Sequence, residues 1–168
     1  WFQGIKTEEY PLRYGENPQQ KAVALVNDKS FVQLSGEKRL SYNNLLDLDA
    51  AINIVYNTSS KENICTIVKH NIPCGGAITK NQKNSYLKAL AGDPLSAFGG
   101  IVTFNQKLTA VTAKLIVKNF YEVIAAPDFE KEAIKILQTK KNLRVLKVKK
   151  FKTQTEQLFN KDFEGFDF

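Results

Sequence analysis

Apolar residues along this chain follow two spacings, and the two spacings alternate. Short runs rich in β-branched residues predict buried strands. Longer segments with apolar residues at helical intervals predict helices between those runs. The expected strands are residues 65–68, 101–104, 122–125 and 143–148, and the expected helices are residues 42–56, 85–91, 109–119 and 128–139. This alternation predicts an α/β sheet with helices on both faces.

The first part of the chain combines a hairpin pattern with a proline-containing loop. Residues 21–26 and 31–34 are short alternating runs around Asn27-Asp28, which predicts that they pair as a hairpin. Residues 10–20 contain two prolines and a glycine, so turns are expected there. Within that loop, Arg13-Tyr14 combines a forked cation with an aromatic ring. This pair suits a bound phosphate or carboxylate as well as it suits an ordinary surface turn.

The candidate active centre is Lys69-His70, at the point where the expected strand at 65–68 stops. His70 is the only histidine in the chain. Residues 71–76 contain a proline and two glycines, which predicts a turn, and loops after buried strands are where α/β proteins hold ligands. A cation and a titratable imidazole are therefore expected to emerge together. Taken alone, such a pair more often serves structure than catalysis.

Other segments are candidates to surround this centre. Gly75-Gly76 would let backbone amides approach an anion, although glycine pairs are common in plain turns. Residues 93–100 are rich in Ser, Gly and Asp and carry Phe98, which suits a pocket wall or an ordinary connection to the next strand. Three polar residues follow the expected N-cap Ser41 in the first helix: Asn44, Asp47 and Asp49. Such acids mostly face solvent, and the alternative is that one of them faces the site.

Composition limits the class of protein. Hydrophobic residues make up 43% and charged residues 24%, which is ordinary for a soluble domain, and no run approaches the ~20 apolar residues of a membrane span. Cys65 and Cys74 have no metal-ligand spacing and no secretory leader is present, so reduced thiols in a cytoplasmic protein are expected. The absence of methionine and the opening residues 1–4 suit a piece of a longer protein, with residues 1–11 a cloning remnant or interdomain linker.

The net charge of +7 comes largely from the last part of the chain. Such a basic run is usually a solvated tail, and the alternative is a field that attracts anionic small molecules or nucleic acid. No known nucleic-acid motif accompanies it, so nucleic acid is a weak second choice and no membrane partner is expected. Phenylalanines recur in residues 149–168, which predicts that this basic tail docks on something, such as the rest of a longer chain.

Several stretches together resemble one enzyme family. They are LRYGENPQQKA (12–22), LSYNNLLDLDAA (40–51), IVKHNIPCGGA (67–77), GDPLSAFGGIV (92–102), and EVIAAPDFEKEAIKIL with KKNLRVL within 122–146. In this order and spacing, the chain resembles the first half of the folate-dependent AICAR transformylase domain. In that family the domain is joined to an IMP cyclohydrolase domain in a bifunctional purine biosynthesis protein. The resemblance assigns residues 12–148 to the first transformylase subdomain.

The resemblance implies formyl transfer from the co-substrate 10-formyl-tetrahydrofolate to the 5-amino group of AICAR. It implies a cytidine-deaminase-like three-layer α/β fold and a homodimer with sites at the subunit interface. Lys69 and His70 match the catalytic pair of the family. The residues that match its substrate-binding positions are Arg13, Tyr14, Asp49, Asn71, Asp93, Ser96, Phe98 and Gly99.

Two comparisons with related patterns sharpen these expectations. Gln19 stands where the family usually has a histidine, which leaves His70 as the available imidazole base. A zinc deaminase would need His-x-Glu and Pro-Cys-x-x-Cys, but His70 is followed by Asn-Ile and Pro73-Cys74 by Gly-Gly-Ala, so no metal is expected. The alternative to an enzyme is a non-catalytic module, derived from this domain, that binds nucleotide or supports a dimer.

Overall fold

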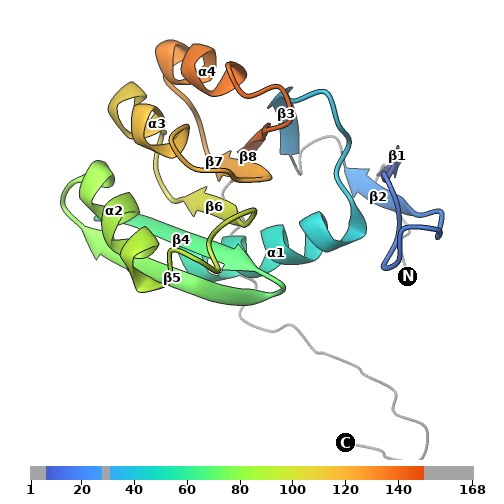
Figure 1. The fold of residues 1–168 in the computed structure, drawn as a ribbon, viewed down its shortest axis with the longest axis horizontal. Helices are drawn as coiled ribbons and strands as arrows, with labels where there is room; N and C mark the ends of the chain where they lie inside the picture. The colour runs from blue at the N-terminus through green and yellow to red at the C-terminus, as the bar shows by residue number, and fades with distance from the viewer. Residues whose placement is uncertain (1–6, 28–30, 150–168) are drawn as a thin grey trace, which may run out of the picture.

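The computed structural model describes residues 7–27 and 31–149, and Figure 1 shows their arrangement. The expectations for residues 1–6 and for the phenylalanine-containing tail after Lys149 therefore lie outside the described residues. The strands are β1 (Thr7–Pro11), β2 (Val23–Asn27), β3 (Phe31–Ser35), β4 (Asn63–Lys69), β5 (Ile72–Thr79), β6 (Ile101–Phe104), β7 (Val123–Ala126) and β8 (Arg144–Val148). The helices are α1 (Tyr42–Asn57), α2 (Gln82–Gly92), α3 (Ala110–Ile116) and α4 (Lys131–Gln138).

The main sheet has six strands in the order β3-β8-β7-β6-β4-β5. Strands β6, β7 and β8 run parallel, whereas β4 is antiparallel to β6. The register pairs Val68 with Ile101, Ile101 with Val123, and Val123 with Arg144. The carboxyl end of β4 therefore lies at the same edge of the sheet as the amino ends of the three parallel strands. This edge carries Lys69-His70.

Helices cover both faces of this sheet, which confirms the expected three-layer α/β fold. On one face, α1 packs Leu48 and Ile52 against alternate residues of β6 to β8, among them Val123 and Leu146. On the other face, α2, α3 and α4 pack against the residues between them, such as Ile124. Figure 1 shows these three helices on the side of the sheet opposite α1. Strands β6 and β7 are buried on both faces, as their nearly unbroken apolar runs predict.

The hairpin expected from residues 21–26 and 31–34 is wrong. Strand β2 pairs with β1 in a separate two-stranded sheet, and β3 pairs with β8 at the edge of the main sheet. The reason is that alternation identifies a strand but not its partner, and the apolar side of Phe31 finds its cover beside α1 and β8. The pairing with β2 also makes Thr7–Pro11 a strand within the segment expected to be linker.

The helices lie where the pattern predicts them, with shifted ends. Ser41 caps α1 in a capping box: its side chain accepts from the Asn44 amide, and the Asn44 side chain accepts from the Ser41 amide. Helix α2 begins earlier than expected, after the N-cap Asn81, and α4 begins only after Glu130. No helix of the described residues is long and apolar enough to cross a membrane.

Candidate active site

His70 and Asn71 form a two-residue turn between β4 and β5. Lys69 pairs directly with Ile72, and the φ angles of the two turn residues are 53° and 64°. Both residues therefore have the left-handed backbone that a type I′ hairpin turn requires. Asparagine and histidine are among the non-glycine residues that adopt this conformation most often. The imidazole is thus placed at the tip of a tight hairpin, exposed at the edge of the sheet.

The turn expected over residues 71–76 is therefore mostly wrong, because Ile72–Thr79 is strand β5. Pro73 is tolerated because β5 is an edge strand and the β4–β5 register shifts beside it, between Ile67 and Val68. Gly75 is required for another reason: a Cβ there would overlap the backbone oxygen of Ala89 in α2. The glycine pair lies within strand β5, not in a turn directly before the helix, so it does not form the anion-binding turn that was one of the two alternatives there.

Lys69 connects this hairpin to the segment at 93–100. Strand alternation puts Lys69 on the face that carries Cys65 and Ile67, which is the face covered by α2. Its Nζ donates a 2.8 Å hydrogen bond to the backbone oxygen of Phe98. An ammonium has three N–H donors, so two remain for a ligand. The contact brings together two motifs that are far apart in the sequence.

The segment at 93–100 folds back on itself at the end of α2. Asp93 follows the helix, and its Oδ1 accepts from the Ser96 amide at 3.0 Å. Hydrogen bonds from the side chain and backbone of Ser96 lower the pKa of the Asp93 carboxyl, which therefore stays ionised at neutral pH. Gly99, with φ of 77°, turns the chain so that its amide donates to the Phe120 oxygen at 2.9 Å. This left-handed backbone favours glycine at that position.

A cavity of about 280 Å³ lies between the hairpin and this segment. It is lined by Lys69, His70, Ile72, Pro73, Cys74, Asp93 and Ser96. Four of these were expected from the sequence, and the structure brings them together. Cys74 was not expected at this cavity, because nothing in its sequence spacing indicated a site. Burial, and then the charge of Asp93, raises the pKa of its thiol, so it stays protonated at neutral pH.

Asp47 of α1 supports the turn from the other face of the sheet. Its Oδ1 accepts from the Asn71 amide at 2.7 Å, and its Oδ2 accepts from the His70 amide at 3.2 Å. The sequence had left open whether an acid of this helix faces the site, and Asp47 contacts the site backbone. Asp49 does not contact the site. Its side chain is exposed and accepts a hydrogen bond from the Asn53 side chain, one turn further along α1.

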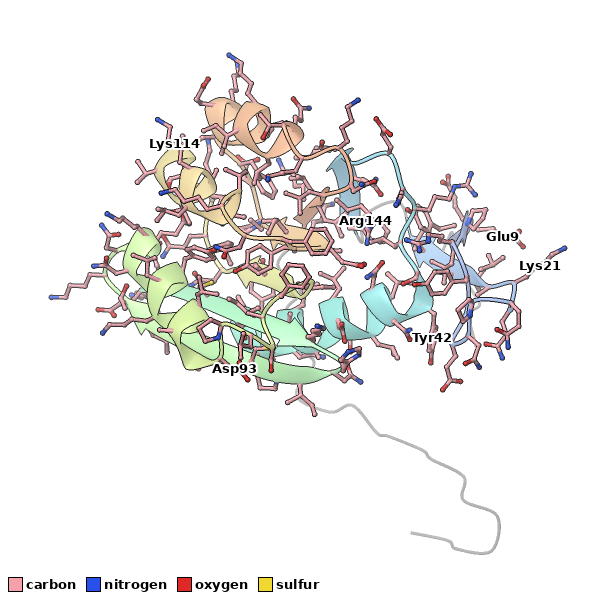
Figure 2. All side chains as sticks on the ribbon, viewed as in Figure 1. Glu9, Lys21, Tyr42, Asp93, Lys114 and Arg144 are labelled. Atoms are coloured by element: carbon pink, nitrogen blue, oxygen red, sulfur yellow. The ribbon has the colours of Figure 1, made fainter. Side chains whose placement is uncertain are left out.

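Arg13 and Tyr14 lie outside the cavity, beside the start of α1. The Arg13 guanidinium stacks 4.9 Å from the centre of the Tyr14 ring. The backbone amide of Arg13 donates to the backbone oxygen of Leu40, and the backbone amide of Tyr42 donates to the backbone oxygen of Tyr14. Figure 2 shows Tyr42 at the start of α1, well separated from Asp93 at the end of α2. Neither Arg13 nor Tyr14 lines the cavity that Lys69 and His70 line.

The Phe98 side chain points away from the first cavity. It is 62% exposed and packs against Phe120, with ring centres 5.1 Å apart. Both rings line a second cavity of about 460 Å³, between the ends of α3 and α4. Phe98 thus contacts Lys69 through its backbone oxygen, while its ring packs against Phe120.

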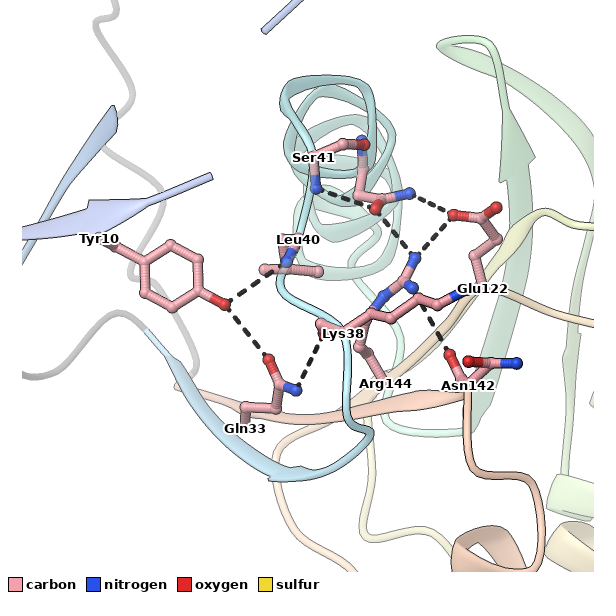
Figure 3. Close-up of polar contacts among 9 residues, drawn as sticks. Tyr10, Gln33, Lys38, Leu40, Ser41, Glu122, Asn142 and Arg144 are labelled. Atoms are coloured by element: carbon pink, nitrogen blue, oxygen red, sulfur yellow. Dashed lines mark hydrogen bonds and ion pairs between the residues drawn. The ribbon is translucent and has the colours of Figure 1, made fainter. Parts of the chain in front are cut away.

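A buried ionic cluster lies further along the same sheet edge (Figure 3). Arg144 begins β8, and its side chain is only 2% exposed. Its NH2 donates to Glu122 Oε2 at 2.6 Å and to Asn44 Oδ1 at 2.9 Å, while Asn44 Nδ2 donates to the same Glu122 oxygen. The sequence did not identify this cluster, because an arginine in a basic run gives no sign of burial. It fixes the start of α1 to the sheet.

The site thus offers an imidazole, an ammonium and a carboxylate around one cavity. Proton transfer by His70 and charge stabilisation by Lys69 are chemistries that such groups perform. Among residues 7–27 and 31–149, no group of three His, Cys, Asp or Glu side chains is placed to hold a metal ion.

Comparison with known proteins gives one consistent result. Residues 2–166 match the model of the family described as "AICARFT/IMPCHase bienzyme". The bifunctional purine biosynthesis protein PurH of Clostridium perfringens is 47% identical over 160 residues, which cover 84% of this chain and 31% of the relative. The protein of the same name from Persephonella marina is 46% identical over 153 residues, 86% of this chain and 29% of the relative. The match therefore spans under a third of either relative's length.

Proposed function

Because the chain belongs to the AICARFT/IMPCHase bienzyme family, we propose that it supplies the Lys69-His70 half of a transformylase site in a longer polypeptide. The reaction is formyl transfer from 10-formyl-tetrahydrofolate to the 5-amino group of AICAR, in purine biosynthesis. The observation that carries the proposal is the pair Lys69-His70 beside Asp93 and Ser96 around one cavity. The names of the curated relatives, which state purine biosynthesis and two activities, agree with it.

His70 acts as the general base in this proposal. The acceptor amine is conjugated with the neighbouring carboxamide and is a poor nucleophile, so its proton must leave as it attacks. A new bond forms between the amine nitrogen and the formyl carbon, and the imidazole takes the proton. Histidine suits this step because the ordinary pKa of an imidazole, ~6.5, lies close to neutral pH. A positioned base of this kind contributes typically ~10²–10⁴-fold in rate.

Lys69 acts on the other side of the formyl carbon. Attack places negative charge on the formyl oxygen, and an ammonium already fixed by the Phe98 oxygen can stabilise that charge without reorganising. The bond from the carbon to N10 of the folate then breaks, and N10 gains a proton from Lys69 or from water. No metal takes part in this scheme.

The remaining expected residues bind substrates in the proposal. Asp93, Ser96, Asn71 and the Phe98-Gly99 segment lie next to the catalytic pair. Arg13, Tyr14 and Asp49 do not line that cavity, so we expect them to act where a second copy or the remainder of the polypeptide completes the substrate site. We propose that the working protein is a homodimer located in the cytoplasm.

The test is an assay of formyl transfer by the full-length polypeptide that carries this chain. The rate is measured as the release of tetrahydrofolate. His70→Asn is the sharpest variant, because asparagine tolerates the left-handed backbone of the turn but has no imidazole. We expect the variant to lose ~10²-fold or more in kcat. The turn itself is expected to be retained, which a matching thermal unfolding midpoint would establish.

Each outcome assigns the chain differently. An active wild type with an equally active His70→Asn variant would refute the catalytic role of His70. A wild type that binds AICAR but transfers no formyl group, even as the full-length polypeptide, would indicate the non-catalytic nucleotide-binding module instead.

A further inference from the structure

We propose that Asp47 is a positioning residue for His70, and that its carboxylate holds the turn which presents the imidazole to the substrate. This inference rests on the proposed formyl transfer. Asp47 does not touch the cavity that Lys69 and Asp93 line. It acts through the backbone of the turn.

The contact is made by both oxygens of one carboxylate. Oδ1 lies 2.7 Å from the Asn71 nitrogen, and Oδ2 lies 3.2 Å from the His70 nitrogen. Two consecutive amides that point at the same ionised group are fixed in both distance and direction. Charge-assisted bonds of this kind are stronger than bonds to a neutral acceptor. The peptide planes on either side of the His70 Cα are thereby restrained.

The backbone of the turn explains why such a restraint is useful. His70 and Asn71 both have positive φ angles, and neither is glycine. Residues other than glycine adopt this backbone region rarely. They are found there where the surrounding structure fixes their conformation. A turn with glycine would need less support but would carry no imidazole. Asp47 therefore allows a base to occupy a position where turn geometry would favour glycine.

The helix that carries Asp47 is anchored at its start. Three residues earlier on the same side of α1, Asn44 is bonded to the buried Arg144 and to Glu122. The capping box with Ser41 fixes the first turn of the helix. The first two turns of α1 thus connect the ionic cluster at β7 and β8 to the tip of the β4–β5 hairpin.

A purely structural role for Asp47 predicts a loss of stability, whereas the positioning role predicts a loss of rate. The hairpin is paired from Asn63↔Thr79 to Lys69↔Ile72, and α2 packs on β5, so its strands do not depend on the carboxylate. Loss of Asp47 is therefore expected to loosen His70 and Asn71 without unfolding the sheet. A misplaced base lowers the rate of the chemical step, whereas AICAR contacts common to the ground and transition states are retained.

The experiment compares three variants of the full-length polypeptide. Asp47→Ala removes both acceptors, and Asp47→Asn keeps one oxygen for the Asn71 amide. Asp128→Ala is the control, because Asp128 is a half-buried carboxylate that pairs with Lys147 and Lys107 beyond the carboxyl end of β7, away from the cavity. We expect Asp47→Ala to lower kcat about tenfold or more while KM for AICAR changes less than about threefold. Asp47→Asn should recover part of that loss, and Asp128→Ala should leave kcat unchanged.

Amide NMR of the same proteins gives a readout that does not depend on activity. The His70 and Asn71 amide resonances should shift upfield in Asp47→Ala and lose protection from exchange. Unchanged kcat in Asp47→Ala, or a loss equal to that of Asp128→Ala, would overturn the positioning role while the formyl transfer stood. A wild type without transfer would instead overturn the proposed function, and the positioning role would fall with it.

Discussion

Lys69 Nζ lies 2.8 Å from the backbone oxygen of Phe98, although the two residues are 29 positions apart in the chain. The bond joins the end of β4 to the segment that follows α2. It fixes the ammonium beside His70 and at the wall of the cavity formed with Asp93. A charge held in place before a substrate arrives is what stabilisation of a developing oxyanion requires.

Replacement of Lys69 tests that role. Lys69→Ala is expected to lower kcat of the full-length polypeptide by ~10²–10³-fold, the usual cost of a lost oxyanion donor. The unfolding free energy should change by less than about 1 kcal/mol, because the lost bond lies at an exposed edge. Lys80→Ala, at an exposed lysine just after β5, is the control and should be fully active. Equal activity of the two variants would contradict the assignment.

The two glycines of β5 make a matched pair for stability. A Cβ at Gly75 would overlap the Ala89 oxygen of α2, whereas at Gly76 the nearest atom, Thr66 Oγ1, would be 3.7 Å away. Gly75→Ala is therefore expected to destabilise the fold by about 3 kcal/mol or more, because α2 must move. Gly76→Ala should be neutral or stabilising by up to about 1 kcal/mol. Urea unfolding measures both, and comparable losses would show that α2 does not pack as described.

The layers of the fold follow from local pattern. β-branched runs on β6 to β8 require cover on both faces, and the segments between them have the length and spacing of helices. The start of α1 was predictable because Ser41 is followed, three residues later, by a side chain that can return the capping bond. These features depend on neighbours within a few positions. The position of Lys69-His70 at the end of a buried strand also follows from local sequence, since the pair ends an apolar run.

The contacts that complete the site join residues far apart in the sequence. Asp47 meets the His70 amide across 23 positions, and Arg144 meets Asn44 across 100 positions. Periodicity assigns a side chain to a face but does not name its partner, so neither contact could be predicted. The same limit explains the wrong hairpin of β2 and β3. Gly75 was misinterpreted because close packing and tight turns both select glycine.

The ionic cluster at Arg144 predicts unequal effects of its two charges. Arg144→Ala removes a side chain that is 2% exposed and leaves Glu122 and Asn44 without their donor. We expect a loss of about 3 kcal/mol in unfolding free energy, at the low end for a broken buried pair, since Glu122 is 37% exposed. Glu122→Gln keeps an oxygen for Arg144 and should cost about 1 kcal/mol. Urea titration of both variants checks the order, and a larger loss in Glu122→Gln would contradict it.

Tyr56 and Tyr10 are expected to respond oppositely to replacement by phenylalanine. The Tyr56 hydroxyl is buried without a hydrogen-bond partner among the described residues, so Tyr56→Phe should stabilise the fold by about 1 kcal/mol at pH 7. The Tyr10 hydroxyl donates to Gln33 and accepts from the Leu40 amide, so Tyr10→Phe should destabilise it (Figure 3). Urea unfolding at pH 7 measures both signs. A stabilising Tyr10→Phe or a destabilising Tyr56→Phe would contradict the contacts described.

The advantage of Tyr56→Phe should also depend on pH. Burial raises the pKa of Tyr56 from 10.0 to about 12. Between these values the unfolded chain releases the phenolic proton while the folded chain keeps it, so the wild type binds more protons when folded. Its stability is therefore unaffected below pH 10.0 and falls as the pH rises towards 12, whereas the variant has no such group. Urea unfolding at pH 8 and near pH 11 should show the difference between the two proteins widening. A constant difference would mean that the hydroxyl reaches solvent, since its pKa would then be the same in both states.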